Sequence, residues 1–364
     1  MDNTLLFSIL RSNQGYMKHK SERGMFDEHF RLEKISKQND PLIKLNSSIR
    51  WDQFQPILNE AFKKDRGVGG RPSYDYLLMF KILILQRYYN LSDDQCEYQI
   101  LDRLSFMRFL GLRLSDRVPD SKTIWLFRQT LTENGAIEKL FERFIQSLDA
   151  LGLIINEGKI VDASFVEAPK QRNSREENAQ IKAGETPEGW SGNPHKTAQK
   201  DTDAKWTKKN SETHFGYKNH IKADQKSKLI ENYVVTDASV HDSQAMADLL
   251  EDKDVGQGLY ADSAYRSEEM EDVLQFLEII SQIHEKGTRA EALSEEQQQN
   301  NRSKSKVRVR IEHIFGFVEN SMNGSRLRSI GIKRAKGIIG LMNLTYNMFR
   351  SIQIISSQGI TVAI

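Results

Sequence analysis

One short pattern occurs three times in this 364-residue chain: a run of apolar residues, then an aspartate, then two small residues. The three aspartates are Asp162, Asp237 and Asp262. Small residues after an aspartate leave its carboxylate open at the end of a strand, where α/β proteins usually carry their sites. One such aspartate alone is more often a turn former or a helix cap. Three in one region favour a carboxylate metal site.

The ligand types indicate which metal such a site would hold. Cys96 is the single cysteine, which excludes a disulfide framework and a thiolate cage, and the histidines are not clustered. Carboxylate oxygens select Mg²⁺ or Mn²⁺ over Zn²⁺. Two such ions, about 4 Å apart, can activate a nucleophile and stabilise the leaving oxygen of a phosphodiester. Holding them normally takes a third carboxylate ligand.

Glu312 is a candidate for the third ligand. Residues 307–322 are expected to form a helix, because their apolar residues recur at helical spacing. This stripe consists of Ile311, Ile314, Phe315, Val318 and Met322. At about 100° per residue, Glu312 lies at the edge of the stripe and would face along the sheet. Arg308, one turn earlier, would favour the ionised form of Glu312. The alternative is an ordinary exposed Arg–Glu pair.

The elements that must position these residues change character along the chain. The first 150 residues show helical patterns, with a buried helix at 74–89 and helix starts at Ser92 and Asp120. From residue 153 on, short apolar runs alternate with helical spacing, which predicts an α/β domain. Strands are expected at 153–155, 159–161, 231–236, 258–261 and 279–283, and helices at 242–250 and 268–277. A polar insert at about 167–213 contains Trp190 and Trp206.

Charge and hydropathy describe a chain suited to water and to an anionic partner. The mean hydropathy is −0.59, and the longest apolar run, residues 77–85, is interrupted and too short to span a bilayer. The net charge is only +2, yet residues 302–336 carry ten Lys and Arg against two Glu. Such clustering attracts a phosphate backbone, although a solvated basic surface is an equal alternative. We expect a soluble protein of a reducing compartment.

Several segments together resemble a known family over almost the whole chain. Two segments are N-terminal. The first runs from Arg71-Pro72-Ser73-Tyr74 to Leu91-Ser92-Asp93, and the second runs from residues 109–111 to residues 118–123. The later ones are residues 203–209, 214–220, Ala261-Asp262-Ser263-Ala264-Tyr265, residues 310–316 and Asn343-Leu344-Thr345-Tyr346-Asn347. In this order and spacing they resemble the DDE-type transposases of bacterial insertion sequences, in the insertion-sequence-five family.

The resemblance implies a fold and a ligand set. The fold would be an α/β, RNase H-like catalytic domain, a mixed five-stranded sheet with flanking helices, preceded by an all-α N-terminal region. The first three strands would be antiparallel and the fourth would lie beside the first. The three acidic ligands fall on Asp162, Asp262 and Glu312, holding two Mg²⁺ ions, with Mn²⁺ as a substitute. Asp237 would end strand three, about 9–10 Å from strand one, and would be structural or would support a ligand without binding metal itself.

The same resemblance implies a domain organisation. Residues 1–70 would be an N-terminal segment and linker, and residues 71–150 a helical DNA-binding region. Residues 151–350 would form the catalytic domain with its insert, and residues 351–364 a C-terminal tail. Related transposases carry a Tyr, Arg, Glu, Lys series around the last ligand. Here Arg308 and Glu312 fit that series, whereas Ser305 and Glu319 replace the Tyr and the Lys.

The activity implied is that of a transposase in the bacterial cytoplasm, associated with the nucleoid. It would bind the terminal inverted repeats of its insertion sequence, cleave the ends by metal-dependent hydrolysis and join the 3′-hydroxyl ends to target DNA, as a homodimer. Candidate DNA contacts are Arg308, Arg310, Trp206, Lys208, Lys209, Lys218, Arg326 and Arg328. Trp206 could instead anchor the insert. Two other functions stay open: a non-catalytic DNA-binding protein derived from a transposase, and an RNase H-like nuclease without strand transfer.

Overall fold

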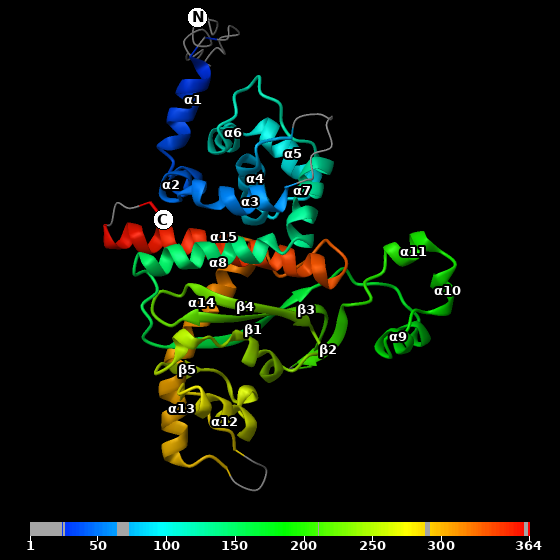
Figure 1. Cartoon of the computed structure of the whole chain (residues 1–364), viewed down its shortest axis with the longest axis vertical. Coiled ribbons are helices and arrows are strands. Elements are labelled where there is room, and N and C mark those ends of the chain that lie inside the picture. The colour runs from blue at the N-terminus through cyan, green and yellow to red at the C-terminus, as the bar shows by residue number, and fades with distance from the viewer. Residues whose placement is uncertain (1–23, 25, 64–72, 210, 288–291, 360–362) are drawn as a thin grey trace, which may run out of the picture. The chain divides into compact units, whose positions relative to one another are not determined.

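The computed structural model describes residues 24, 26–63, 73–209, 211–287, 292–359 and 363–364. The chain divides into two units, residues 1–40 and residues 41–364. The described part of the first unit contains helix α1 (Asp27–Ser36), and every other element belongs to the second unit (Figure 1). Residues 64–72, which include part of the expected linker and the start of the first family-like segment, lie outside the described residues.

The second unit opens with helices, as the sequence predicts. They are α2 (Pro41–Ser48), η1 (Trp51–Phe54), α3 (Gln55–Ala61), α4 (Tyr76–Tyr88), α5 (Asp93–Asp102), α6 (Leu104–Leu110), α7 (Ser121–Glu133) and α8 (Ala136–Ala150). Helix α4 is the expected buried helix, with side chains buried on all its faces. Ser92 and Gln95 form a capping box at α5, and the Asp120 carboxylate accepts a hydrogen bond from the Thr123 N–H at α7. Both predicted helix starts are confirmed.

The sheet has six strands rather than the five expected. They are β1 (Lys159–Glu167), β2 (Lys205–Lys209), β3 (Glu212–Asp224), β4 (Ile230–Asp237), β5 (Gly258–Tyr260) and β6 (Ile280–Ser281). Their order is β2-β3-β1-β5-β6, and β4 also pairs with β3. Strand β2 arises within the polar insert and pairs with residues 212–216 of β3, while β4 continues along residues 217–223. Strands β1, β3 and β4 are antiparallel, and β5 is parallel to β1, as the resemblance implies.

Two predicted elements are wrong. Residues 153–155 do not form a strand; Leu153 and Ile154 are buried in the core as irregular chain. The chain there is bounded by Gly152 at φ 67° and Asn156 at φ 58°, left-handed conformations outside the extended region of a regular strand. Residues 242–250 form two short 3₁₀ turns, η2 (Asp242–Ala245) and η3 (Ala247–Leu249), instead of one helix.

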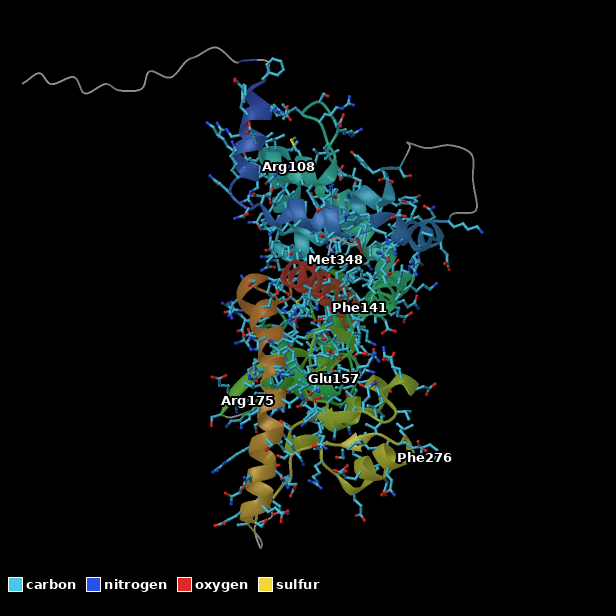
Figure 2. All side chains as sticks on the ribbon, turned by 90° about the vertical axis from the view of Figure 1, so that its left-hand side faces the viewer. Arg108, Phe141, Glu157, Arg175, Phe276 and Met348 are labelled. Atoms are coloured by element: carbon cyan, nitrogen blue, oxygen red, sulfur yellow. The ribbon has the colours of Figure 1, made fainter. Side chains whose placement is uncertain are left out.

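Helices cover both faces of the sheet. Helix α15 (Ile332–Gln358) and α8 cross one face and separate it from helices α2 to α7 of the same unit (Figure 1). Figure 2 labels Met348 of α15 and Phe141 of α8, two buried side chains in this layer. The turns η2 and η3, with η5 (Ser263–Tyr265) and α12 (Glu268–Phe276), enclose a second, smaller core, and η4 (Asp252–Asp254) follows η3 in the chain. No helix among the described residues is long and apolar enough to cross a membrane.

Helix α15 is tied to the sheet by two buried asparagines of the segment 343–347. Asn343 and Asn219 of β3 exchange side-chain hydrogen bonds of 2.9 and 3.1 Å. Asn347 Nδ2 donates to the Ile230 carbonyl at 2.7 Å, and Asn347 Oδ1 accepts from the Ile230 N–H at 2.9 Å. The family-like segment therefore has a structural role that its pattern alone did not reveal.

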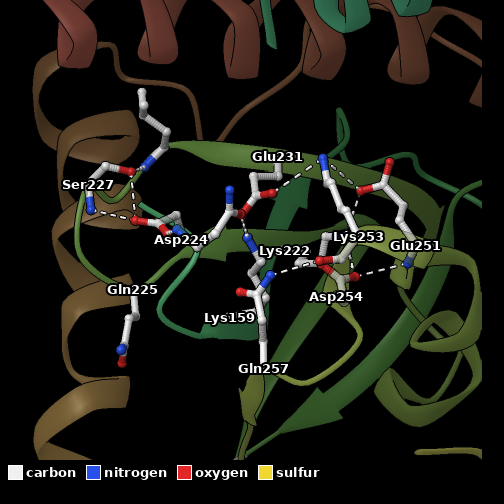
Figure 3. A network of polar contacts seen from close by, with 12 residues as sticks. Lys159, Lys222, Asp224, Gln225, Ser227, Glu231, Glu251, Lys253, Asp254 and Gln257 are labelled. Atoms are coloured by element: carbon white, nitrogen blue, oxygen red, sulfur yellow. Dashed lines mark hydrogen bonds and ion pairs between the residues drawn. The ribbon is translucent and has the colours of Figure 1, made fainter. Parts of the chain in front are cut away.

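A network of buried charges fixes the beginning of β1 (Figure 3). Lys159 donates to Glu231 at 2.5 Å, and Lys222 donates to Asp254 at 2.5 Å and to Glu251 at 2.6 Å. Lys253 lies within 3.3 Å of both glutamates, Glu231 and Glu251. Buried charges of this kind are tolerated only when paired, so the network ties β1, β3 and β4 to the turn η4.

The polar insert contains a small helical assembly around Trp190. Its helices are α9 (Arg175–Lys182), α10 (Glu188–Ser191) and α11 (Pro194–Ala198), which lie to one side of the sheet in Figure 1. The indole of Trp190 is buried and donates to Glu177 Oε1 at 2.6 Å. Lys196 and Lys200 lie 5.6 and 5.2 Å from its ring centroid. Trp190 is thus the core of the insert.

Candidate active site

The topology brings Asp162 and Asp262 together beyond the point where β1 and β5 pair, although Asp162 lies inside β1 rather than after its last residue, where the sequence predicted it. Strands β1 and β5 are parallel neighbours, with Ile160 opposite Tyr260. Asp162 is two residues after Ile160, and Asp262 is two residues after Tyr260. Both aspartates therefore lie just beyond the last paired residues of the two strands. Asp162 is 7% exposed, and Asp262 begins the turn η5, where its Oδ1 accepts from the Ala264 N–H at 2.8 Å.

Arg308 lies against both aspartates. It is the last residue of α13 (Glu295–Arg308), and its Nη2 is 3.2 Å from Asp162 Oδ2 and 3.9 Å from Asp262 Oδ2. Its Nε is buried and has no hydrogen-bond partner among the described residues. The sequence placed Arg308 beside Glu312 by helical spacing. In the fold it instead reaches the two carboxylates of the sheet.

The electrostatics around Asp162 favour a positive charge at this point. Burial raises the pKa of the Asp162 carboxyl, and the nearby Asp262 adds to this rise. The Arg308 charge and the Ala163 N–H act in the opposite direction and stabilise the ionised form. Two carboxylates that face one cationic group suit a divalent metal ion, which prefers oxygen ligands.

Glu312 is placed differently from the two aspartates. It lies in the first turn of α14 (Arg310–Gly316), and the π-helical segment η6 (Phe317–Ser321) follows. Ile311 and Ile314 are buried, as the predicted apolar stripe requires, and Glu312 itself is exposed. Within the described residues, no three His, Cys, Asp or Glu side chains lie close enough to hold a metal together. The structure thus joins Asp162 with Asp262 and leaves Glu312 outside that pair.

Asp237 is distant from this pair in the sheet. It ends β4, which pairs with β3 rather than with β1. Its Oδ1 accepts from the N–H of Ser239 at 2.8 Å and from the hydroxyl at 2.5 Å. These bonds form the turn after β4, which is the structural role expected for it.

With this geometry in place, comparison with protein-family models identifies the chain. A model described as "Transposase DDE domain" matches residues 156–348, more than half of the chain. The chain belongs to this family. It is a DDE-type transposase, and a second model, "Transposase domain (DUF772)", matches residues 30–130. Membership of the insertion-sequence-five family in particular stays a prediction.

Among solved structures, the transposase is similar to a piggyBac transposase seen by cryo-electron microscopy in a synaptic complex with hairpin DNA. The two chains are 14% identical, and the match covers 89% of this chain and 77% of that one, with a TM-score of 0.44. The α/β, RNase H-like class expected for the transposase is confirmed by its matching domain and its sheet.

Some candidate DNA contacts of the transposase are accessible. Trp206 is 45% exposed and rests on Phe215 with ring centroids 4.9 Å apart, so it both anchors β2 and offers a free face. Lys208 and Lys209 are exposed on the same strand. Arg326 has 77% of its side chain exposed and lies 3.5 Å from Glu167 Oε2. Arg328 is exposed and donates to the Asn90 carbonyl at 3.0 Å.

Two other candidate DNA contacts, Lys218 and Arg310, form hydrogen bonds within the transposase itself. Lys218 is 8% exposed and donates to the Val240 carbonyl at 2.6 Å and to Asp242 at 2.8 Å. Arg310 donates to the Gln225 carbonyl at 2.9 Å. Both therefore hold the chain around the sheet.

No pattern in the sequence pointed to one group of arginines in the transposase. Arg87 of α4 and Arg128 of α7 line the same pocket as Arg328. They stand singly in the helical region, more than 190 residues away along the chain, so only the fold gathers them.

Proposed function

We propose that this transposase binds the terminal inverted repeats of its own insertion sequence, cleaves the ends and joins the 3′-hydroxyl ends to target DNA. The observation that carries the proposal is the pair Asp162 and Asp262, just beyond the parallel pairing of β1 with β5, facing one cationic group. A paired carboxylate site suits a reaction in which negative charge develops on phosphodiester oxygens.

The proposed cofactor is Mg²⁺, with Mn²⁺ as a substitute, two ions per active site. Asp162 and Asp262 would hold them, and Glu312, on the helix that begins two residues after Arg308, would be the third ligand. When bound, such ions lower the pKa of water and offset charge on the phosphate oxygens. Arg308 contributes a fixed positive charge beside Asp162, which favours the ionised form of that carboxylate against the opposite effect of its burial.

The proposed DNA contacts are the accessible basic and aromatic residues. Trp206, Lys208 and Lys209 form a stacking and phosphate-binding strand, since indoles stack on bases while ammonium groups hold phosphates. Arg326 and Arg328 follow η6, and Arg308 lies at the carboxylates. Lys218 and Arg310 would act through the loops that they hold. We further propose that residues 71–150 read the inverted repeats, and that two copies bring both ends together as a homodimer.

A cleavage experiment tests this proposal. A labelled DNA fragment carrying the flanks of the gene is incubated with the full chain in Mg²⁺, Mn²⁺ or EDTA. Wild-type protein is compared with Asp262→Asn, and Asp237→Asn is the matched control because its carboxylate serves a turn. We expect metal-dependent nicks at the element ends and joined products for the wild type and for Asp237→Asn, and neither for Asp262→Asn.

The other outcomes point to the alternatives. Specific binding without cleavage in any metal would indicate a DNA-binding protein derived from a transposase. Cleavage without joined products would indicate a nuclease. Equal activity of Asp262→Asn and wild type would remove Asp262 from the site.

A further inference from the structure

A pocket of about 290 Å³ lies where α4 and α7 meet the chain that leads into α15. Its lining contains one carboxylate, Asp93, and an excess of arginines. They are Arg87, Arg128, Arg326, Arg328 and Arg334. Such an excess of one charge around a small volume indicates a site for an anion.

The single carboxylate is already neutralised by one of these arginines. Arg128 Nη1 and Nη2 donate to the two oxygens of Asp93 at 2.6 and 2.9 Å, a bidentate pair. Arg328 donates to a backbone carbonyl, and Arg334 donates its Nε to Gln129 at 2.9 Å. Neither contact removes charge, so the pocket keeps a net positive charge.

Buried polar atoms in the pocket are also unsatisfied. The Nε of Arg87 and the hydroxyl of Ser329 are buried and have no hydrogen-bond partner among the described residues. Burial and the charges of Arg128 and Arg328 together lower the pKa of Arg87 to about 10, against the opposite effect of Asp93. A buried guanidinium with an unpaired donor and two like charges nearby is stabilised when an anion enters.

One aromatic side chain suggests which anion. Trp125 of α7 lines the pocket, is 42% exposed and has the guanidinium carbon of Arg334 5.9 Å from its ring centroid. An exposed indole beside guanidinium groups suits a nucleotide. Its base can stack on the aromatic ring, and the guanidinium groups can donate two hydrogen bonds each to the phosphate oxygens.

We propose that this pocket binds one backbone phosphate of the DNA, held by Arg87, Arg328 and Arg334, with Trp125 against the neighbouring base. The site draws on the helical region and on the chain that leads into α15, so one phosphate would tie both to the same DNA strand. This inference rests on the proposed function only in taking DNA as the partner; it does not require cleavage.

The test is the salt dependence of DNA binding by the full chain in EDTA, measured by fluorescence anisotropy on the element-end fragment. For one phosphate contact, the slope of log K against log salt changes by about 0.9. We expect a slope flatter by about this amount for Arg328→Gln and for Arg334→Gln. If Arg328 and Arg334 hold the same phosphate, the slope of the double variant should differ from the wild-type slope by the same amount as that of each single variant, not by twice that amount. Arg175→Gln, an exposed charge on α9, is the matched control and keeps the wild-type slope.

Other outcomes would overturn the inference. Wild-type slopes in Arg328→Gln and Arg334→Gln, with unchanged melting temperatures, would make these arginines an ordinary charged surface. A free anion is the second source of the same chemistry. A free anion would be indicated by two results together. Inorganic phosphate would raise the melting temperature of the wild type but not of Arg328→Gln, and the salt slopes of DNA binding would be equal for these two proteins. If the wild-type protein binds DNA without cutting it, the proposed function fails. The salt slopes of the variants still show whether the pocket binds a DNA phosphate.

Discussion

The link between α15 and the sheet gives a prediction whose size follows from the structure. Asn347 is fully buried, and its side chain binds both the N–H and the carbonyl of Ile230, which is also fully buried. In Asn347→Leu these two backbone groups lose their partner at the beginning of β4. Each unsatisfied buried group costs about 1–3 kcal/mol. The added leucine carbons recover part of this, so we expect a loss of about 2–4 kcal/mol in unfolding free energy.

The other buried asparagine pair supplies the matched control. Asn219 and Asn343 bind each other rather than the backbone. Asn343→Leu alone leaves the Asn219 amide unpaired, and we expect a loss of about 1–3 kcal/mol. Replacing both asparagines by leucine removes both polar groups together, so the double variant should lie within about 1 kcal/mol of wild type.

Urea unfolding followed by far-ultraviolet circular dichroism measures these differences as shifts of the transition midpoint. The expected order of stability is wild type, the double variant, Asn343→Leu and then Asn347→Leu. The reasoning is refuted if Asn347→Leu unfolds at the same urea concentration as the double variant, because unsatisfied backbone groups would then cost nothing.

Three further predictions concern single side chains. Burial lowers the pKa of His220 to about 4, so as the pH falls below about 6.5 the unfolded chain takes up a proton first and stability is lost down to about pH 4. His220→Gln should therefore show a smaller fall in melting temperature between pH 7 and 5 than wild type; an equal fall would contradict this. In Gly340→Ala the new carbon would lie 2.9 Å from Ile137 and press on Tyr233, so the melting temperature should fall by several degrees, whereas Ala at exposed Gly192 should leave it unchanged. Arg308→Ala should raise the pKa of Asp162 in carboxyl carbon NMR, and Arg308→Lys should raise it less; equal values in all three proteins would show that Arg308 does not act on this carboxylate.

The helical region was predictable because its signals are local. A capping box needs only residues three apart, so Ser92 and Gln95 could be recognised without the fold. The apolar stripe through Ile311 and Ile314 depends in the same way on helical spacing, and both residues are buried. The local pattern also marked Asp162 and Asp262 as candidates, but it marked Asp237 equally, and only the family resemblance separated the three.

Features that depend on distant partners were not predictable from the pattern. Strand β2, Lys205–Lys209, is rich in lysine and exposed, and it becomes a strand because the edge of β3 is free to pair with it. The run at 153–155 looked like a strand because it is apolar, whereas its side chains enter the core without sheet pairing. Likewise, Lys218 was expected to contact DNA, yet it is buried and donates to Asp242.

The basic segment 302–336 shows most clearly what the fold adds. In the sequence it is one cluster of positive charge, and a single DNA-binding surface is the simplest interpretation. In the structure its arginines separate: Arg308 faces the aspartates, Arg310 holds a carbonyl, and Arg328 enters the pocket with Arg87. Because electrostatic attraction falls with distance, an arginine acts with its neighbours in space rather than in sequence. The segment therefore supplies two separate positions in the fold, one beside the carboxylates and one at the pocket, rather than one continuous surface.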